Sequence, residues 1–215
     1  MKLLTRIIFT KQKLKYGISA GLHPTTRCNL SCNYCSSAIF LGKEPVFKNE
    51  LTAKQWLLIL LKYKPRINII TISGGEPSIY KDIVPLVNGL TENKIAVRIL
   101  TNLMSKRLLE IDKSPYIRIF TTFHYSYANL DKFTENLKLY KKKFLVSINE
   151  LDGKPKMIKG SSVKLLETFD SPGRISSTSE GNDLTYCRLN KGTIFIPDGR
   201  IVSTEHERDL LADNY

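Results

Sequence analysis

Residues 67–100, INIITISGGEPSIYKDIVPLVNGLTENKIAVRIL, contain one complete repeat of the expected fold. Residues 67–72 and 95–100 are short runs rich in Ile and Val, as is typical of buried strands. Residues 80–92 between them have a helical pattern. Two parallel strands need a crossover of about a dozen residues, and this helix supplies it. The stretch therefore predicts a strand–helix–strand unit of a parallel sheet.

The same alternation of strand and helix continues on both sides of this unit. Repeated units of this kind form a doubly wound sheet or an α/β barrel. A complete eight-unit barrel needs about 250 residues, more than the 215 present. The predicted fold class is therefore α/β, a partial (β/α)6 TIM-like open barrel. Further strands are expected at residues 18–22, 117–123, 144–148 and, as strand or helix, 163–169, and further helices at residues 53–63, 105–111 and 129–143, the first with Thr52 as its N-cap.

The C-terminal part of the chain has a different composition. Residues 170–183 are rich in Ser, Gly, Pro and Asn and are expected to form a loop. Residues 192–203, GTIFIPDGRIVS, place a Pro-Asp-Gly turn between two β-rich arms, which predicts a hairpin. We therefore expect a partial barrel over residues 1–170 and a short β tail over residues 171–215.

The overall composition is that of an ordinary globular protein with a basic surface. Hydrophobic residues make up 42% and charged residues 25%, which excludes general disorder. Lys and Arg number 33 against 20 Asp and Glu, a net charge of +13. An acidic partner such as nucleic acid is one interpretation of this charge. No nucleic-acid-binding motif accompanies it, so a solvated, lysine-rich surface is the simpler interpretation.

Nothing in the sequence predicts membrane insertion or export. The longest apolar run, residues 56–61, is much shorter than the roughly 20 residues that a membrane helix needs. The N-terminal residues MKLLTRIIFTKQKLK are interrupted by Arg6 and Lys11 and lack the cleavage site of a signal peptide. A cytoplasmic, reducing location is expected, where clustered cysteines are more often metal ligands or catalysts than disulfides.

Three of the four cysteines lie in the segment TTRCNLSCNYC, residues 25–35, directly after the first expected strand. Cys28, Cys32 and Cys35 have the spacing C-x3-C-x2-C. Thiolates this close can surround one metal centre, and soft sulfur ligands suit an iron–sulfur cluster or zinc. Closed structural zinc needs four protein ligands, and Cys187 or His23 could supply the fourth. Loops after barrel strands are also where active sites lie.

Together with Tyr34 before the last cysteine, this spacing resembles the radical S-adenosylmethionine (radical SAM) superfamily. A second motif supports the resemblance: the segment Ser73-Gly74-Gly75-Glu76-Pro77 follows the second strand and is similar to the family's GGEP motif. Glycines at these positions remove side chains so that backbone groups can approach a ligand, and Glu76 adds an acceptor. The two motifs in this order on successive loops are specific, and the resemblance covers about residues 15–150.

The resemblance implies a cofactor pair and a ligand set. Cys28, Cys32 and Cys35 would hold a [4Fe–4S] cluster, and S-adenosylmethionine would chelate its open iron. One electron from an external donor of the flavodoxin or ferredoxin type would then release a 5′-deoxyadenosyl radical that abstracts a substrate hydrogen. Tyr34 would lie near the adenine. Gly74, Gly75, Glu76 and Pro77 would form the loop that binds the methionine amino group.

Later strand ends carry weaker candidates. Asn102, Thr122 and Asn149 lie at the ends of the third, fourth and fifth strands, and we expect them to contact the cofactor. Asn149 lies close to where members of the resembled family contact the ribose or adenine. His124 at the end of the fourth strand suggests a catalytic residue, either a substrate contact or a proton donor. The alternative is a histidine hydrogen-bonded within its own loop.

Several other conspicuous residues have simpler explanations. His23 is expected to support the cysteine loop, and Trp56 on an apolar helix face is expected in the core. Arg98 and Arg118 lie within strands, and an outward-facing, solvated position explains them. Tyr125 is explained by packing against the neighbouring helix as well as by a place in a binding site.

The tail beginning at Cys187 resembles the start of the SPASM or twitch extension of many radical SAM enzymes. In that extension a second cysteine follows the Pro-Asp-Gly hairpin, whereas here Val202-Ser203-Thr204-Glu205 occupies the place and no cysteine follows. A single cysteine cannot hold a second cluster without unusual ligands such as Glu205 or His206. We interpret the tail as a hairpin without its cluster that covers an open barrel edge, with Cys187 as a free thiol or a binding-site residue.

The sequence therefore predicts a radical SAM enzyme acting on a peptide, protein or small-metabolite substrate. Three alternatives stay open. One is a nucleotide- or nucleoside-modifying enzyme similar to 7-carboxy-7-deazaguanine synthase. Another is an activase that forms a glycyl radical on a partner, and the last is a non-catalytic, metal-stabilised module that binds nucleic acid.

Overall fold

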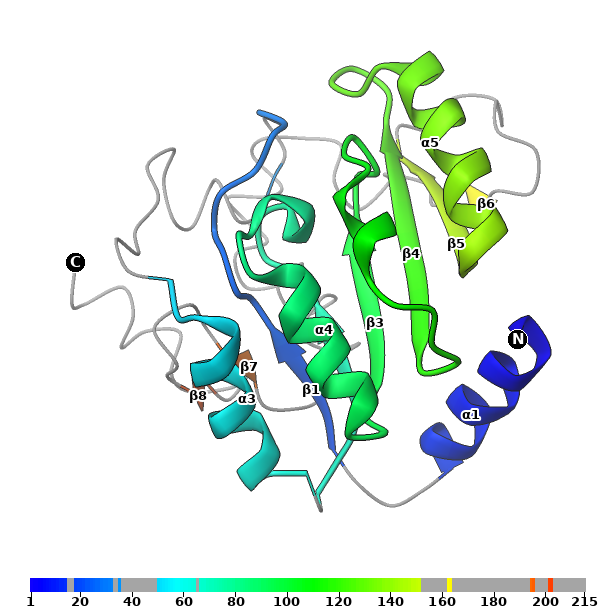
Figure 1. The fold of residues 1–215 in the computed structure, drawn as a ribbon. Coiled ribbons are helices and arrows are strands. Elements are labelled where there is room, and N and C mark those ends of the chain that lie inside the picture. Colours follow the sequence, from blue (N-terminus) through cyan, green and yellow to red (C-terminus); the bar gives the residue numbers. More distant parts are fainter. Residues whose placement is uncertain are drawn as a thin grey trace.

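The centre of the molecule is a sheet of eight strands in the order β6-β5-β4-β3-β2-β1-β7-β8 (Figure 1). The computed structural model describes residues 1–14, 18–32, 35, 50–64, 66–151, 162–163, 194–195 and 201–202. The strands are β1 (Ile18–Leu22), β2 (Ile67–Ile72), β3 (Ala96–Thr101), β4 (Ile117–His124), β5 (Leu145–Leu151), β6 (Ser162–Val163), β7 (Ile194–Phe195) and β8 (Ile201–Val202).

Strands β1 to β6 are parallel and lie side by side in the order in which they occur in the chain. A doubly wound sheet would reverse its strand order at a switch point, and these six strands show no reversal. The arrangement is that of an opened α/β barrel, which confirms the predicted fold class. Only β6, Ser162–Val163, is described from the expected sixth strand; residues 164–169 lie outside the described part of the chain.

Three helices cover one face of this sheet, as Figure 1 shows for α3, α4 and α5. Trp56 and Leu60 of α3, Leu86 of α4 and Phe133 of α5 are fully buried against the sheet in the main hydrophobic core. The prediction of Trp56 as a core residue is thus confirmed. The helices are α1 (Lys2–Leu14), α3 (Ala53–Lys62), α4 (Ile83–Glu92) and α5 (Leu130–Lys143), with 3-10 helices η1 (Pro77–Ile79) and η2 (Arg107–Glu110).

Two side chains fix the starts of these helices. Thr52 accepts a hydrogen bond from the Gln55 backbone N–H at 3.3 Å, and the Gln55 side chain accepts one from the Thr52 N–H at 2.8 Å. This reciprocal pair is a capping box and confirms the predicted cap. Asn129 caps α5 in a similar way by accepting from the Lys132 N–H at 2.8 Å.

Two expected helices differ from the structure at their boundaries. The helix expected at residues 105–111 is only the 3-10 helix η2, because a segment this short cannot offset the cost of nucleating an α-helix. The helix expected at 80–92 begins at Ile83, since Tyr80 is in an extended conformation and its hydroxyl donates to the Leu51 carbonyl.

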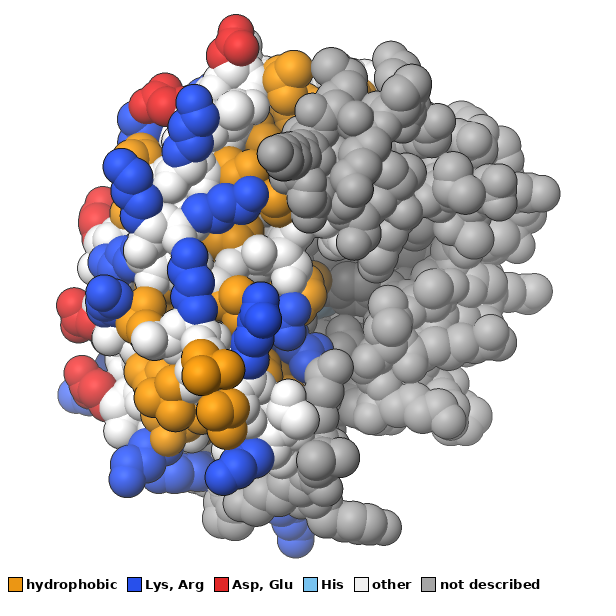
Figure 2. Space-filling view, turned by 90° about the vertical axis from the view of Figure 1, so that its right-hand side faces the viewer, with side chains coloured by type: hydrophobic (Ala, Val, Ile, Leu, Met, Phe, Trp, Pro, Cys, Tyr) orange, Lys and Arg blue, Asp and Glu red, His pale blue; other side chains and the backbone are white. Residues whose placement is uncertain are grey.

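Helix α1 was not expected from the sequence, and it lies on the other face of the sheet. Phe9 is 2% exposed and packs with Ile69 and Ala96 in a second, smaller core. The opposite side of α1 leaves Leu3 71% and Ile7 42% exposed. Figure 2 shows hydrophobic side chains together with Lys and Arg on this side of the molecule. Among the described residues, no helix is both long and apolar enough to cross a membrane.

Side chains of β4 alternate between the two faces of the sheet. Ile119 and Phe123 belong to the core under the helices, whereas Arg118, Phe120 and Thr122 point to the face opposite α3, α4 and α5. Arg98 of β3 pairs with Arg118 and shares this face. Both arginines are partly buried, with buried Nε atoms. The outward-facing, solvated position expected for them is therefore wrong, because their strands are parts of a sheet whose second face is also partly covered.

The C-terminal hairpin closes one edge of the sheet. Strand β7 pairs with β8 antiparallel, as the Pro-Asp-Gly turn predicts, and with β1 in parallel. An uncovered edge strand would expose unpaired backbone groups, and β7 pairs with that edge of β1. The expected hairpin at the open barrel edge is confirmed, whereas the division at residues 170 and 171 stays a prediction.

Candidate functional site

The cysteine loop leaves the carboxyl end of β1, where barrel enzymes carry their active sites. Cys28 is exposed, Cys32 is buried and Cys35 is intermediate. The Cys35 N–H donates to the Cys32 carbonyl at 3.2 Å, so these two residues lie in one turn. The Leu30 N–H lies 3.4 Å from the Cys28 sulfur and donates to it. Such N–H donors stabilise a thiolate ligand and tune the potential of a cluster.

The three thiols fit an iron–sulfur cluster by their chemistry. All are soft donors on one short loop, the ligand type that such clusters use. Desolvation of its sulfur raises the pKa of the Cys28 thiol, and the neighbouring Glu76 and Cys35 raise it further against the hydrogen bond from Leu30. Among the described residues, no three Cys, His, Asp or Glu side chains form a group that could hold a metal ion. The assignment of the three cysteines as cluster ligands therefore stays a prediction.

The GGEP loop after β2 is in direct contact with the cysteine loop. The Gly75 N–H donates to the Thr25 carbonyl at 3.0 Å, and the Glu76 N–H donates to the Arg27 carbonyl at 2.8 Å. Gly74 has a φ of +104°, and a Cβ on Gly75 would lie 1.9 Å from the Arg27 carbonyl oxygen. The glycines are thus required by the cysteine loop itself. Access for a ligand, the reason expected from the sequence, stays a prediction.

Glu76 joins the GGEP loop to the end of β3. It is 2% exposed, and one carboxylate oxygen accepts from the Ser78 N–H at 3.0 Å and the Thr101 hydroxyl at 2.7 Å. The other oxygen accepts from the Asn102 N–H at 2.8 Å. Burial raises the pKa of Glu76, and these hydrogen bonds oppose the rise. Its expected contact with a bound cofactor stays a prediction; its described contacts tie two loops together.

Asn102 extends this connection to the cysteine loop. Its side-chain amide donates to the Asn29 side chain at 2.7 Å and lies 3.9 Å from the Cys28 sulfur, to which it also donates. The expected cofactor residue Asn102 therefore contacts the cysteine motif directly. The Asn102 side chain therefore links the loop after β1 to the carboxyl end of β3.

Residues after Asn102 show strain that the sequence does not reveal. Leu103 is fully buried and has a φ of +62°, a conformation unfavourable for side chains other than glycine. The Asn136 side chain of α5 donates to the Leu103 carbonyl at 2.7 Å, and the Leu103 N–H donates to Thr101 at 3.1 Å. These bonds hold the turn that presents Asn102. No local pattern around Leu103 or Asn136 could have identified them.

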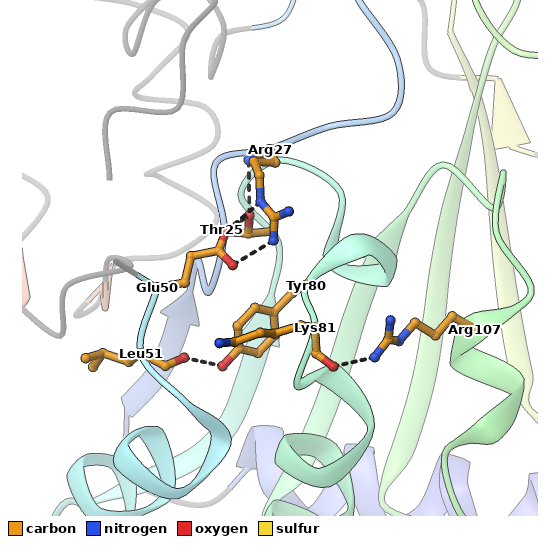
Figure 3. Close-up of polar contacts among 7 residues, drawn as sticks. All are labelled: Thr25, Arg27, Glu50, Leu51, Tyr80, Lys81 and Arg107. Carbon is orange, nitrogen blue, oxygen red and sulfur yellow. Dashed lines mark hydrogen bonds and ion pairs between the residues drawn. The ribbon is translucent and has the colours of Figure 1, made fainter. Parts of the chain in front are cut away.

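Glu50 is a second residue that sequence reasoning missed. It accepts hydrogen bonds from Arg27 at 3.0 and 2.8 Å and another from the Thr25 hydroxyl (Figure 3). A bidentate arginine–carboxylate pair fixes orientation as well as distance. Figure 3 also shows Tyr80 bonded to Leu51 beside this pair. The start of the cysteine loop is thus anchored to the segment before α3.

The later strand ends place Thr122 and Asn149 next to each other. These residues are paired in the register of β4 and β5, and both are partly exposed. His124 lies two pairs further along β4, and burial lowers its pKa to about 4. Its imidazole is therefore neutral near pH 7, which does not suit a charged proton donor; a substrate contact stays a prediction.

The supporting residues are placed as follows. His23 lies directly against Gly74, as expected for a residue that supports the cysteine loop. Tyr125 packs edge-on against Phe123 with ring centroids 4.8 Å apart, so packing accounts for it. Tyr34, Cys187, Glu205 and His206 lie outside the described residues.

A comparison with protein families identifies the superfamily to which this chain belongs. The sequence model described as the Radical SAM superfamily matches residues 22–134, just over half of the chain. This chain belongs to the radical SAM superfamily. Superfamily members are enzymes that use a [4Fe–4S] cluster and S-adenosylmethionine. The zinc-stabilised, non-catalytic alternative is therefore disfavoured.

Radical SAM relatives of this chain act on different substrates. An S-adenosylmethionine-dependent nucleotide dehydratase of Selenomonas ruminantium is 32% identical over 84 residues, which cover 38% of this chain and 28% of the relative. A PqqA peptide cyclase of Rhodopseudomonas palustris is 37% identical over 90 residues, covering 41% and 22%. The chain spans under a third of the length of these two curated relatives.

A solved structure supports the same superfamily assignment. The crystal structure of Streptococcus suis SuiB bound to the precursor peptide SuiA superposes with a TM-score of 0.56 and 25% identity, covering 70% of this chain and 37% of SuiB. The likeness extends beyond the residues that the family model matches.

Proposed function

We propose that this chain cleaves S-adenosylmethionine reductively and that the resulting radical abstracts a hydrogen atom from its substrate. The cofactor pair, when bound, supplies the one-electron chemistry and the 5′-deoxyadenosyl radical. Cys28, Cys32 and Cys35 would hold the cluster through three of its irons. The chain itself orients the reactants and excludes water from them.

The observation that carries this proposal is the junction of three loops at the carboxyl ends of β1, β2 and β3. Asn102 contacts Cys28 and Asn29 on the cysteine loop, while its backbone binds Glu76 on the GGEP loop. Both family motifs are thus held together by the chain's own hydrogen bonds. A rigid junction of this kind suits a site that must hold a cluster and a cofactor in register.

We propose roles for the remaining residues on the basis of the family motifs and the strand ends. We place the methionine amino group at the GGEP loop, Gly74 to Pro77, with Glu76 as the support behind it. Asn102, Thr122 and Asn149 would face the nucleoside part of the cofactor, and Tyr34 its adenine. His124, neutral at pH 7, would contact the substrate as a hydrogen-bond partner.

We infer a peptide, protein or small metabolite as substrate, with a peptide as the first choice. The peptide cyclase of Rhodopseudomonas palustris and the SuiB complex with its precursor peptide support this choice. A nucleotide is the second candidate, favoured by the nucleotide dehydratase of Selenomonas ruminantium. An external one-electron donor of the flavodoxin or ferredoxin type would complete the reaction.

The test is an anaerobic assay of S-adenosylmethionine cleavage with the reconstituted full chain and a chemical reductant. The unchanged chain should be brown, with broad absorption near ~400 nm, and should form 5′-deoxyadenosine. Cys32→Ala should lose this product while its far-UV spectrum stays that of a folded α/β protein. The matched control Cys187→Ser should keep both iron and product.

Two results would contradict this proposal. Product formation by Cys32→Ala would remove this residue from the ligand set. A colourless protein with one tightly bound zinc would revive the metal-stabilised module. Substrate classes would then be compared by following deuterium from labelled peptides and nucleotides into 5′-deoxyadenosine.

A further inference from the structure

Two arginines lie side by side on the sheet face opposite α3, α4 and α5. Arg98 of β3 and Arg118 of β4 are paired residues in the register of these neighbouring strands. Both guanidinium groups approach the ring of Phe120, at 5.9 Å and 4.5 Å from its centroid. The Arg118 guanidinium also donates to the Ser147 hydroxyl at 2.9 Å. The ring and the hydroxyl hold two cations at one level of the sheet.

This arginine pair has no counter-charge among the described residues. The ion pairs described there join Arg27 to Glu50 and Lys106 to Glu135. The Nε atoms of Arg98 and Arg118 are buried and have no hydrogen-bond partner. Burial lowers the pKa of both groups, and Arg118 lowers that of Arg98 further by like-charge repulsion. Two partly buried cations that repel each other are costly for the folded chain.

We propose that Arg98 and Arg118 bind an anionic group of the substrate, a carboxylate or a phosphate. Guanidinium groups bind both oxyanions through paired N–H donors. Both arginines are partly exposed, and an anion bound to their guanidinium groups would offset the repulsion between them. This inference rests on the proposed function, since it assigns the anion to the substrate of that site.

The arginine pair lies close to the strand ends that carry the cofactor junction. Arg98 pairs with Thr71 of β2, and Thr71 pairs with Gly21 of β1, so the pair lies one residue before the ends of both strands. One residue of a strand spans about 3.3 Å. Measured along the strands, the anionic group would therefore lie near the ends that carry the cysteine and GGEP loops. Arg6 of α1 adds positive charge near Arg118.

Anion binding can be measured on the full chain without turnover. The probes are sodium tripolyphosphate and a tetraglutamate peptide, each compared with sodium chloride at equal ionic strength, and the readouts are melting temperature and calorimetric affinity. At least one probe should stabilise the unchanged chain. The double variant Arg98→Met, Arg118→Met should bind it at least about tenfold more weakly. Arg66→Met, which removes an exposed arginine outside this face, is the matched control and should bind as the unchanged chain does.

The two probes distinguish the sources of the anion: a preference for tetraglutamate indicates an acidic peptide, and a preference for tripolyphosphate indicates a nucleotide. Equal binding by the Met variant and the unchanged chain, or no response of the unchanged chain to either probe, overturns the proposal. Should the Met variant fail to fold, Arg98→Lys with Arg118→Lys keeps the charge but loses the paired donors. If the Lys variant binds the probe as tightly as the unchanged chain does, the proposal is also overturned. Failure of S-adenosylmethionine cleavage would refute the proposed function and leave this binding test unaffected.

Discussion

Replacing Glu76 by Gln tests whether its carboxylate holds the GGEP loop to the end of β3. The carboxylate accepts from three donors, the Ser78 N–H, the Thr101 hydroxyl and the Asn102 N–H. A carboxamide has one acceptor oxygen, so its NH2 group must face at least one of these donors. The orientation that keeps the first two bonds leaves the Asn102 N–H opposite another donor.

The size of the effect follows from this geometry. Losing a hydrogen bond to a charged acceptor costs about 1.5–3 kcal/mol, and a buried N–H without a partner adds to the loss. Removing a buried charge returns part of this cost, because burial raises the pKa of Glu76. We expect a net loss of about 2 kcal/mol in the free energy of unfolding. In a chain of this size that corresponds to a decrease in melting temperature of about 4–8 °C.

The assay is thermal and urea unfolding of Glu76→Gln followed by circular dichroism near pH 7. Glu135→Gln is the matched control: this exposed carboxylate pairs only with Lys106 among the described ion pairs, and its loss should leave the melting temperature unchanged. A double-mutant cycle with Thr101→Val should show a coupling free energy, since the two side chains share a bond. A melting temperature of Glu76→Gln equal to that of the unchanged chain would refute the reasoning.

The remaining predictions concern one histidine and helix α1. Burial lowers the pKa of His124 to about 4, from 6.5 in the unfolded chain. Between these pH values the unfolded state binds more protons than the folded state. The free energy of unfolding should therefore fall as the pH decreases from 6.5 to about 4, by at most about 3 kcal/mol. His124→Asn should weaken this dependence in pH-dependent urea unfolding, and an unchanged slope would exclude His124 as its source. Phe9→Ala should lower the free energy of unfolding by about 3 kcal/mol, because Phe9 fills the core between α1 and the sheet. Leu3→Ala on the exposed side of the same helix should have little effect, and equal losses from both variants would contradict the described packing.

The repeating parts of the fold could be predicted because their signals are local. Strands β1 to β5 are short β-branched or apolar runs, and Thr52 caps a helix through a partner only three residues away. The cysteine and GGEP motifs likewise have a fixed spacing that the sequence displays. Their proximity in the structure follows from the parallel arrangement of β1 and β2, whose carboxyl ends lie side by side.

Features that depend on distant neighbours could not be predicted. Leu103 adopts an unfavourable conformation, and the side chain that binds its carbonyl, Asn136, lies 33 residues later in the chain. Arg98 and Arg118 look like solvated strand residues until the register places them together beside Phe120. Helix α1 has the charge pattern of a surface segment, and only the packing of Phe9 shows which side it buries.

The pairing of β1 with β7 imposes an order on biosynthesis. Strand β1 ends at Leu22, and β7 begins at Ile194, about 170 residues later. A nascent polypeptide therefore completes β2 to β5 while one side of its first strand waits for a neighbour that has yet to be translated. Closing so long a segment is slow, and an exposed β edge invites pairing with other chains. Expression yield should consequently depend on how fast β7 leaves the ribosome and pairs with β1.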